Sequence, residues 1–218
     1  MTRRQLRWAF NALRWQPTET ELNNALSCIS LEEQKRIQRF QFKRDFLTSL
    51  AGRLMIRRCI KQLLGVPWLD IQLGRTDKGK PILLDQNLQQ RISFNVSHQG
   101  EYTVLAACTS SSSSSSSRGL GGNQSLCSNT MDGGKDSCEL IGIDIMQANR
   151  PHHNTTLPNF FRIMKRQFTQ QEWDFIESWS EDRDKLASFY RLWCLKESVV
   201  KATGGGIGTS SAGINCQL

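Results

Sequence analysis

The sequence predicts an α+β fold, and three patterns support that prediction. Residues 30–65 space their apolar side chains as one face of a helix does, and so do residues 160–180 and 184–204. Residues 92–108 are rich in β-branched and aromatic residues on both sides of a glycine turn, which indicates a β-hairpin. Residues 139–146, ELIGIDIM, return to strand-like composition. Helices and strands that occupy separate stretches of chain are typical of α+β proteins.

The first helical region, residues 30–65, has defined ends. Ser30 followed by Glu33 is a capping box, in which each side chain bonds the backbone amide of the other residue. Gly65 and Pro67 stop the apolar pattern, because glycine readily ends a helix and proline cannot continue one. We expect either two helices or one long kinked helix between these ends.

Similar signals predict the remaining elements. The hairpin is expected to turn at Gln99 and Gly100. A second capping box, Thr169 with Glu172, begins a helix within residues 160–180. In the last helix the apolar residues at helical spacing are expected to form the buried stripe. This stripe consists of Leu192, Leu195, Val199 and Ala202.

Composition argues against several classes of protein. A chain of 218 residues that is 38% hydrophobic can bury one substantial core or two small ones, which disfavours a disordered or fibrous class. No run of about 18 apolar residues is present to span a membrane. The basic start, MTRRQLRWAFNALRWQP, resembles a transit peptide but lacks the apolar stretch of a secretory signal. Seven scattered cysteines without a CxxC pair indicate a reducing compartment, so we expect the cytosol.

The middle of the chain carries a polar insert, residues 109–138, with eight consecutive serines and several glycines. Such a composition cannot assemble a core, so we expect a disordered insert. It separates an N-terminal half, residues 1–108, from a C-terminal half, residues 139–208. Residues 209–218 are expected to be an irregular tail.

The net charge of +8 implies an anionic partner, because a solvated surface does not require such an excess of cations. Nucleic acid, a phosphorylated small molecule and an acidic protein all fit this charge. A cluster of cations stands in RTDKGKP, where Arg75, Lys78 and Lys80 surround Gly79. Glycine lets the backbone approach a phosphate closely, and the three cations can neutralise it. The alternative is an ordinary solvated basic turn.

Two further motifs lie on predicted strands. Ser97 and His98 end the first strand of the hairpin, where they can bind a phosphate or act as acid or base. Neighbouring strand residues point to opposite faces, so the two are not a catalytic dyad, and a turn-stabilising serine beside a partly exposed histidine is the alternative. Asp144 lies among apolar residues, which is costly for a carboxylate unless a metal ion or a cation meets it. A Mg²⁺ ion and a buried ion pair with an arginine are both open.

Glu197 and Lys201 lie four residues apart in the last helix, opposite its predicted apolar stripe. A solvated surface pair is the ordinary interpretation of this spacing. Trp193 on the same side indicates a second contact surface, although packing is the simpler role for it. Together with Asp144, these residues supply two separated carboxylates and a lysine near a basic loop. Mg²⁺-assisted phosphoryl transfer uses groups of these kinds.

The order of these motifs resembles the 4′-phosphopantetheinyl transferase family, in particular its large animal type. The matching motifs over residues 7–208 are GRLMIRR, RTDKGKP, FNVSHQG, GIDIM, FTQQEW and FYRLWCLKESVVKA. The resemblance implies two pseudo-symmetric α+β halves with the site between them. The second half is expected to be incomplete, because the chain ends seventeen residues after Lys201. The apolar stripe of the last helix would then be poorly covered.

The resemblance also implies a reaction, in which the phosphopantetheine arm of coenzyme A moves to a serine of an apo acyl or peptidyl carrier protein. Asp144 and Glu197 would bind Mg²⁺ as the cofactor. Glu197, Lys201 and His98 would be the catalytic residues. The implied contacts with coenzyme A, the donor substrate, are Arg36, Arg75, Thr76, Asp77, Lys78, Gly79, Lys80, Asn95, Val96, Ser97, His98 and Lys201.

The expected partners are coenzyme A and carrier domains of the fatty acid synthase and aminoadipate-semialdehyde dehydrogenase type. We expect a cytosolic monomer that binds neither nucleic acid nor a membrane. Met146 stands where bacterial relatives have a second acid, so a water would complete the metal shell. Two alternatives remain. One is an inactive family member that binds coenzyme A or a carrier protein, and the other is a basic nucleic-acid-binding protein whose affinity would fall steeply with salt.

Overall fold

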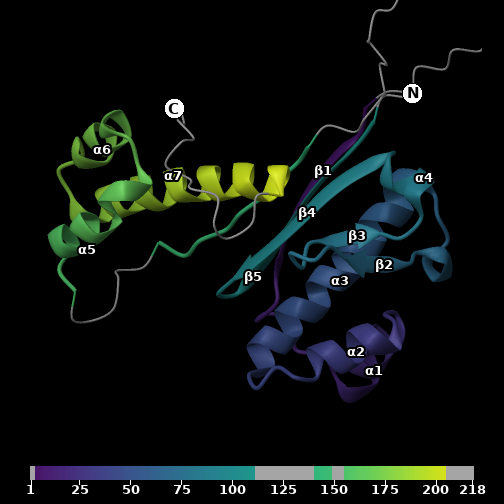
Figure 1. Cartoon of the computed structure of the whole chain (residues 1–218). Helices are drawn as coiled ribbons and strands as arrows, with labels where there is room; N and C mark the ends of the chain where they lie inside the picture. Colours follow the sequence, from purple (N-terminus) through teal and green to yellow (C-terminus); the bar gives the residue numbers. More distant parts are fainter. Residues whose placement is uncertain (1–2, 111–139, 149–154, 205–218) are drawn as a thin grey trace, which may run out of the picture.

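The computed structural model of the chain describes residues 3–110, 140–148 and 155–204. Its main sheet has the strand order β1-β5-β4, and all pairs are antiparallel. The strands are β1 (Gln5–Asn11), β4 (Ile92–Gln99) and β5 (Tyr102–Thr109) (Figure 1). The predicted hairpin is confirmed as β4 and β5, in which Gln99 pairs with Tyr102. Gly100 turns the chain with a φ of 58°, a conformation that glycine adopts without strain.

One face of this sheet is covered by the 22-residue helix α3 (Lys43–Leu64), which packs on β4 and β5. Two shorter helices, α1 (Glu19–Ser27) and α2 (Leu31–Ile37), pack against α3. The capping box of Ser30 and Glu33 is confirmed at the start of α2, and Gly65 ends α3 with a φ of 73°. The region therefore forms two helices rather than one kinked helix. The buried side of α3 and the sheet share one apolar core, centred on Ile60 and Leu105.

A second, two-stranded sheet lies beyond α3. It consists of β2 (Leu73–Arg75) and β3 (Pro81–Leu83), preceded by the short turn η1 (Trp68–Asp70) and followed by α4 (Gln86–Gln89). Leu83 of β3 and Ile71 are buried in the core of the main sheet, so this small hairpin is anchored at its base. Its tip, residues 76–80, carries the predicted basic turn.

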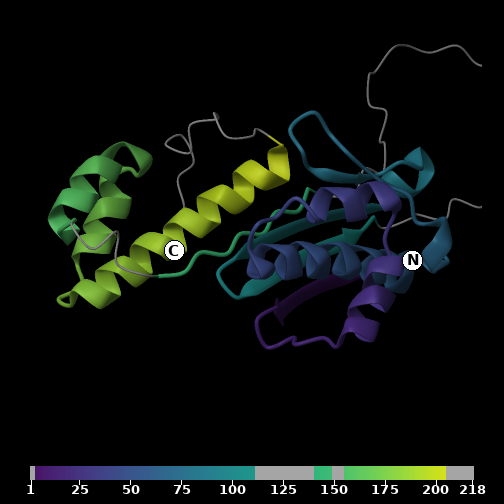
Figure 2. The ribbon, with the colours of Figure 1, turned by 90° about the horizontal axis from the view of Figure 1, so that it is seen from below.

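The C-terminal region is helical where it is described. It contains α5 (Leu157–Met164), the turn η2 (Lys165–Gln167), α6 (Gln170–Glu177) and α7 (Asp182–Thr203). The prediction of one helix over residues 160–180 is wrong, because the capping box of Thr169 and Glu172 starts a separate helix there. In both views the C-terminal end of α7 lies next to the sheet, whereas its N-terminal end lies beside α5 and α6 (Figures 1 and 2).

The strand predicted over residues 139–146 is not formed by the described part, residues 140–148, which is extended but pairs with no strand. The amide of Ile143 donates to the side-chain oxygen of Asn95 at 2.9 Å, so a side chain replaces a backbone partner on β4. Alternate residues of this segment nevertheless face the same way, as in a strand. Gly142 and Asp144 both face α7, and a Cβ at Gly142 would overlap the carbonyl oxygen of Ser198.

The predicted buried stripe of α7 is partly wrong. Leu192 is buried, but Leu195 and Val199 are 40% and 41% exposed. The buried face also contains Phe189, Lys196 and Val200. Aromatic packing decides this orientation, because Phe189 and Trp193 join a cluster with side chains of α5 and α6. Leu195 and Val199 therefore leave an exposed apolar area on this helix, and the expectation that the last helix lacks cover from further strands stays a prediction.

Several expectations lie wholly or largely outside the described residues. The disordered insert predicted over 109–138 is described only at residues 109 and 110, of which Thr109 ends β5. The irregular tail predicted over 209–218 is not described at all. No helix within the described ranges combines the length and the apolar character needed to cross a bilayer.

Candidate active site

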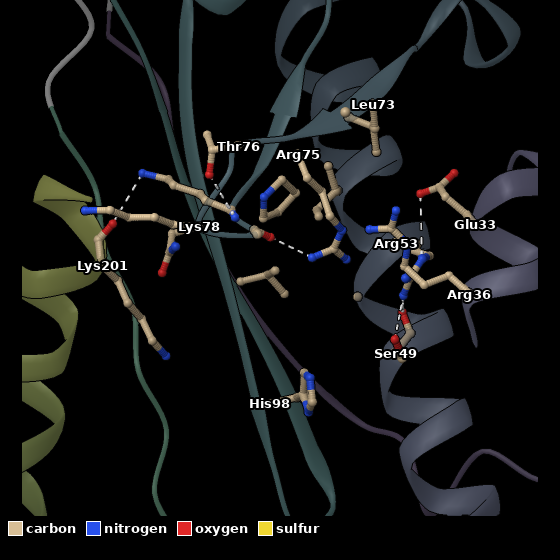
Figure 3. A pocket seen from close by; sticks show the side chains of 18 of the residues that line it. Glu33, Arg36, Ser49, Arg53, Leu73, Arg75, Thr76, Lys78, His98 and Lys201 are labelled. Atoms are coloured by element: carbon tan, nitrogen blue, oxygen red, sulfur yellow. Dashed lines mark hydrogen bonds and ion pairs between the residues drawn. The ribbon is translucent and has the colours of Figure 1, made fainter. Parts of the chain in front are cut away.

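A pocket of about 650 Å³ opens between α3 and α7, below the β2–β3 hairpin (Figure 3). Most of the predicted site residues line it. They are Arg36, all of residues 75–80, Asn95, Val96, His98, Glu197 and Lys201. Ser97 and Asp144 do not line the pocket, but both contact Lys201 in its wall. The structure thus brings together residues from four separate regions of the chain.

The basic loop of residues 75–80 is held in shape by its own hydrogen bonds. The amide of Gly79 donates to the carbonyl of Thr76 at 2.7 Å, and the amide of Thr76 donates to the carbonyl of Lys80 at 2.9 Å. The Arg75 guanidinium donates to the Gly79 carbonyl at 2.6 Å. Gly79 has a φ of 81°, where a side chain would strain the backbone. The predicted turn is therefore rigid and built into the pocket rather than a freely solvated segment.

Two lysines of this loop reach the C-terminal end of α7. The ammonium of Lys78 donates to the Gly204 carbonyl at 2.9 Å, and that of Lys80 donates to the Lys201 carbonyl at 3.3 Å. Helix C-termini carry unpaired carbonyls and a partial negative charge, which attract cations. Burial in the pocket wall lowers the pKa of Lys80 below its ordinary value. The loop and α7 thus form one wall, although they lie far apart in sequence.

The opposite end of the pocket is rich in arginine. Arg53 of α3 is 7% exposed and donates to the carbonyl and hydroxyl of Ser49. Its Nε is buried, donates no hydrogen bond and lies 3.7 Å from a carboxylate oxygen of Glu33. Desolvation, followed by repulsion from Arg75, lowers the pKa of Arg53 to about 10. Glu33 is itself bonded by Arg57, so one carboxylate faces several guanidinium groups.

Sequence reasoning missed this arginine cluster. The motif GRLMIRR contributes to the family resemblance, but that resemblance implies no role for Arg53 or Arg57. The available signal was their spacing of four residues on the same helical face as Ser49 and Ile60, which places two cations in the buried stripe of α3. Figure 3 shows Arg53, Arg36 and Glu33 on the side of the pocket opposite Lys201. The cluster is the most buried cationic part of the pocket wall.

Asp144, Lys201 and Ser97 form a closed polar cluster in the wall. The Lys201 ammonium pairs with a carboxylate oxygen of Asp144 and donates to the Ser97 hydroxyl at 2.8 Å. The Ser97 hydroxyl donates to the same carboxylate oxygen at 2.9 Å. The Asp144 side chain is 6% exposed and that of Lys201 is 31% exposed. The ion-pair alternative for Asp144 is therefore present, but its cation is a lysine rather than an arginine.

His98 lies at the open side of the pocket with an exposed side chain. Partial desolvation, the most important cause, lowers the pKa of its imidazole below 6.5. The positive charges of Lys201 and Arg53 add to this effect, and Asp45 opposes it. The imidazole is thus predominantly neutral at neutral pH, which suits a proton acceptor or a hydrogen-bonding partner.

Two family models match the chain. The model described as 4′-phosphopantetheinyl transferase, N-terminal, matches residues 13–110, and that of the 4′-phosphopantetheinyl transferase superfamily matches residues 140–217. This chain belongs to the 4′-phosphopantetheinyl transferase superfamily. The resemblance inferred from the motifs is thereby confirmed. The first match contains the arginine cluster and the basic loop, and the second contains Asp144 and α7.

Several named phosphopantetheinyl transferases are similar to this chain. The L-aminoadipate-semialdehyde dehydrogenase-phosphopantetheinyl transferase of Rattus norvegicus is 42% identical over 206 residues, and that of Homo sapiens is 40% identical over 206 residues. Each alignment covers 93% of this chain and 57% of the relative. A phosphopantetheinyl transferase of Thraustochytrium sp. is 30% identical over 205 residues, which cover 92% of this chain and 61% of that protein. The chain therefore spans little more than half the length of these relatives.

Members of a phosphopantetheinyl transferase family are expected to bind Mg²⁺, so the donor groups of this chain bear on that expectation. The described residues contain no group of three or more His, Cys, Asp or Glu side chains placed to hold a metal ion. Mg²⁺ does not require such a group, because it is commonly held by one or two carboxylates, substrate phosphates and waters. Glu197 lines the pocket, whereas Asp144 does not line it and is paired with the lining residue Lys201. Their carboxylate oxygens are ligands of the kind that Mg²⁺ prefers, so a site of this type would draw on Glu197, on Asp144 and on the oxygens of a phosphorylated substrate.

Two side chains of α7 that lie outside the pocket, Trp193 and Lys196, have structural roles. Trp193 stacks on Phe189, with ring centroids 6.2 Å apart, so the packing role predicted for it is confirmed. Lys196 is 1% exposed and forms an ion pair of 2.7 Å with Glu172 of α6. It also donates to the carbonyl of Gln167 at 3.0 Å and lies over the Phe168 ring. These contacts fix α7 so that Glu197 and Lys201 reach the pocket.

Proposed function

We propose that this chain transfers the 4′-phosphopantetheine arm of coenzyme A to a serine of an apo carrier protein. The single observation that supports this proposal most is the pocket, in which an arginine end and a lysine end lie on opposite sides of one cavity of about 650 Å³. A donor with a phosphate on its ribose and a separate pyrophosphate needs two such cationic regions. The named relatives, which are phosphopantetheinyl transferases, support the same assignment.

The arginine end supplies the first region. Arg53, Arg36 and Arg75 line the pocket, and a phosphomonoester there would receive guanidinium hydrogen bonds. The carboxylates of Glu32, which pairs with Arg36 at 2.9 Å, and of Glu33 do not balance the positive charges of Arg36, Arg53, Arg57 and Arg75. The rigid loop of residues 75–80 connects this end to the lysine end, where Lys80 and Lys201 would contact the pyrophosphate.

In the proposed reaction the hydroxyl oxygen of the carrier serine forms a bond to the phosphorus that carries pantetheine. The bond from that phosphorus to the bridging pyrophosphate oxygen breaks, and adenosine 3′,5′-bisphosphate leaves with the electron pair. The serine proton must be removed as the new bond forms, and Glu197 in the pocket is the proposed base. Mg²⁺, when bound, would neutralise the charge that develops on the pyrophosphate. Lys201 would supply further positive charge to the same oxygens.

Carrier modification tests this proposal directly. The full chain is mixed with coenzyme A, Mg²⁺ and an apo acyl carrier protein, and the carrier is weighed by intact mass spectrometry. We expect a gain equal to one phosphopantetheine, abolished by Glu197→Gln. Glu181→Gln is the matched control, because Glu181 is exposed at the start of the same helix and its side chain caps no amide. Equal transfer by both variants would reject Glu197 as the base.

A second candidate function is binding of coenzyme A without transfer. The exposed apolar side chains of Leu195 and Val199 favour it, because they leave part of the surface of α7 uncovered. The pairing of Asp144 with Lys201 also favours it, because the pairing occupies a carboxylate that would bind Mg²⁺. Isothermal titration of the folded wild-type chain with coenzyme A separates the two functions. Binding without any gain in carrier mass supports the second function, whereas a mass gain supports transfer. Binding that requires low salt and is competed by nucleic acid would instead support the basic nucleic-acid-binding alternative.

A further inference from the structure

In the cluster of Asp144, Lys201 and Ser97, each side chain forms a hydrogen bond or ion pair with the other two. One carboxylate oxygen of Asp144 accepts from both the Lys201 ammonium and the Ser97 hydroxyl, and that hydroxyl accepts from the same ammonium. Because the carboxylate is 6% exposed, the ammonium supplies much of its neutralisation. Asp144 is therefore occupied by a side chain of its own chain.

The surroundings of Asp144 decide which partner can move. The extended segment is fixed by the contact of Gly142 with the backbone of Ser198 and by the hydrogen bond from Ile143 to Asn95. Ser97 belongs to the paired strand β4. Lys201, in contrast, is 31% exposed, lines the pocket and carries its charge on a flexible four-carbon stem. The lysine is thus the movable member of the cluster.

We propose that the Lys201 ammonium pairs with Asp144 while the pocket is empty, and that the side chain moves to the pyrophosphate when a donor binds. We call this exchangeable pairing the latch. A divalent cation at Asp144 would lie against the ammonium, and two like charges at contact distance repel strongly in a partly buried site. A pyrophosphate in the pocket offers the ammonium another acceptor and frees the carboxylate. Metal and donor binding are then coupled, each strengthening the other.

This inference rests on the proposed function, because it takes Asp144 as a metal ligand and a pyrophosphate as part of the donor. Its distinctive consequence appears without any donor. Replacement of Lys201 removes the latch, so a divalent cation should bind the donor-free chain more tightly. A lysine that served only as a phosphate contact would have no such effect on metal binding.

A matched control is available in the same pocket. Lys80 carries the same charge and lines the same cavity, but its ammonium bonds the carbonyl of Lys201 and not a carboxylate. Lys80→Gln therefore removes one positive charge without freeing Asp144. The comparison with Lys201→Gln separates release of the carboxylate from a general change in the electrostatic potential.

The experiment is a titration of the donor-free full chain with Mn²⁺, with free Mn²⁺ measured by electron paramagnetic resonance. We expect Lys201→Gln to bind Mn²⁺ about tenfold more tightly than the wild type, and Lys80→Gln to stay within about threefold of it. Equal effects of the two substitutions, or no gain in Lys201→Gln, would overturn the latch. Thermal unfolding confirms that each variant is folded, and Lys201→Met serves as a second variant that also lacks the charge.

The double variant Lys201→Gln with Asp144→Asn locates the gained ion. Loss of the gain in the double variant supports the latch at Asp144, whereas a gain that persists places the ion elsewhere and overturns it. Failure of the latch leaves the proposed transferase unaffected, because carrier modification by the wild-type chain is measured separately. Failure of carrier modification likewise does not change the donor-free Mn²⁺ result.

Discussion

Lys201 of α7 and Asp144 of the extended segment form an ion pair beside Ser97 of β4, although they lie 57 positions apart in the sequence. The pair joins the C-terminal helix to the N-terminal sheet through one buried carboxylate. Through its hydrogen bonds with Ser97, the pair also connects the two stretches of chain that the two family models match separately. The position of Asp144 therefore depends on how closely the extended segment packs against α7.

Gly142→Ala tests that packing. The new methyl group would overlap the Ser198 carbonyl, so the segment or the helix must shift. Overpacking of this kind lowers the free energy of unfolding by about 1–3 kcal/mol. We expect this loss in urea unfolding, together with loss of carrier modification, because Asp144 moves with the segment. Leu140→Ala is the control, since Leu140 is 68% exposed on the same segment, and an equal loss there would contradict the packing argument.

Arg53→Gln tests the arginine end of the pocket. Loss of a charged donor to a phosphate costs about 1.5–3 kcal/mol, so affinity for coenzyme A should fall by about 10- to 100-fold in isothermal titration. Arg58→Gln removes the same charge from an exposed position of the same helix and should change the affinity far less. If both variants bind coenzyme A equally well, Arg53 has only a structural role.

His98 provides a prediction for pH dependence. Partial desolvation, with the charges of Lys201 and Arg53, lowers its pKa in the folded chain below 6.5. Between that folded pKa and about 6.5, the unfolded chain binds more protons, so the contribution of His98 to stability is complete above about 6.5 and is lost as the pH falls. Nuclear magnetic resonance titration should give a pKa below 6.5, assigned by its absence in His98→Gln. Lys201→Gln should raise this pKa, and an unchanged value would show that the ammonium does not act on the imidazole.

Local signals in the sequence predicted much of the fold. The capping boxes at Ser30 and Thr169 and the turn at Gly100 depend on neighbouring residues alone, and all three are present. The buried face of α7 was not predictable in this way, because Leu195 and Val199 are as apolar as the residues that are buried. Packing with α5 and α6, which precede the helix in the sequence, decides which face is covered.

In the candidate site, too, some features could be predicted from local sequence and others depend on tertiary contacts. The loop of residues 75–80 was predictable from its basic composition, and its lysines line the pocket. The arginine cluster required knowledge of a tertiary contact, because Arg53 and Arg57 meet Glu33 from a different helix. The pairing of Asp144 with Lys201 likewise depends on chain segments that no local pattern connects. Motif order supplied the family, whereas the partners of each charge came from the structure.

Lys196 makes the last prediction, which concerns the anchoring of α7. Its ion pair with Glu172 is almost fully buried, at 1% and 3% exposure, and joins α7 to α6. Removal of one partner of a buried pair leaves an uncompensated charge, so Lys196→Met should lower the free energy of unfolding by about 3–5 kcal/mol in urea. Arg191→Met, at an exposed position of the same helix, should change it by less than about 0.5 kcal/mol.

A second substitution separates the unpaired charge from lost packing. Glu172→Gln neutralises the carboxylate but keeps an oxygen that can accept from the amide of Thr169, as Glu172 does at 2.8 Å. The double variant Lys196→Met with Glu172→Gln should therefore be more stable than Lys196→Met alone, because the buried charge is gone. A double variant as unstable as Lys196→Met would show that Lys196 acts through its contacts with Gln167 and Phe168 instead. In either case carrier modification should fall with the loss of α7 packing, because Glu197 is the next residue along the helix.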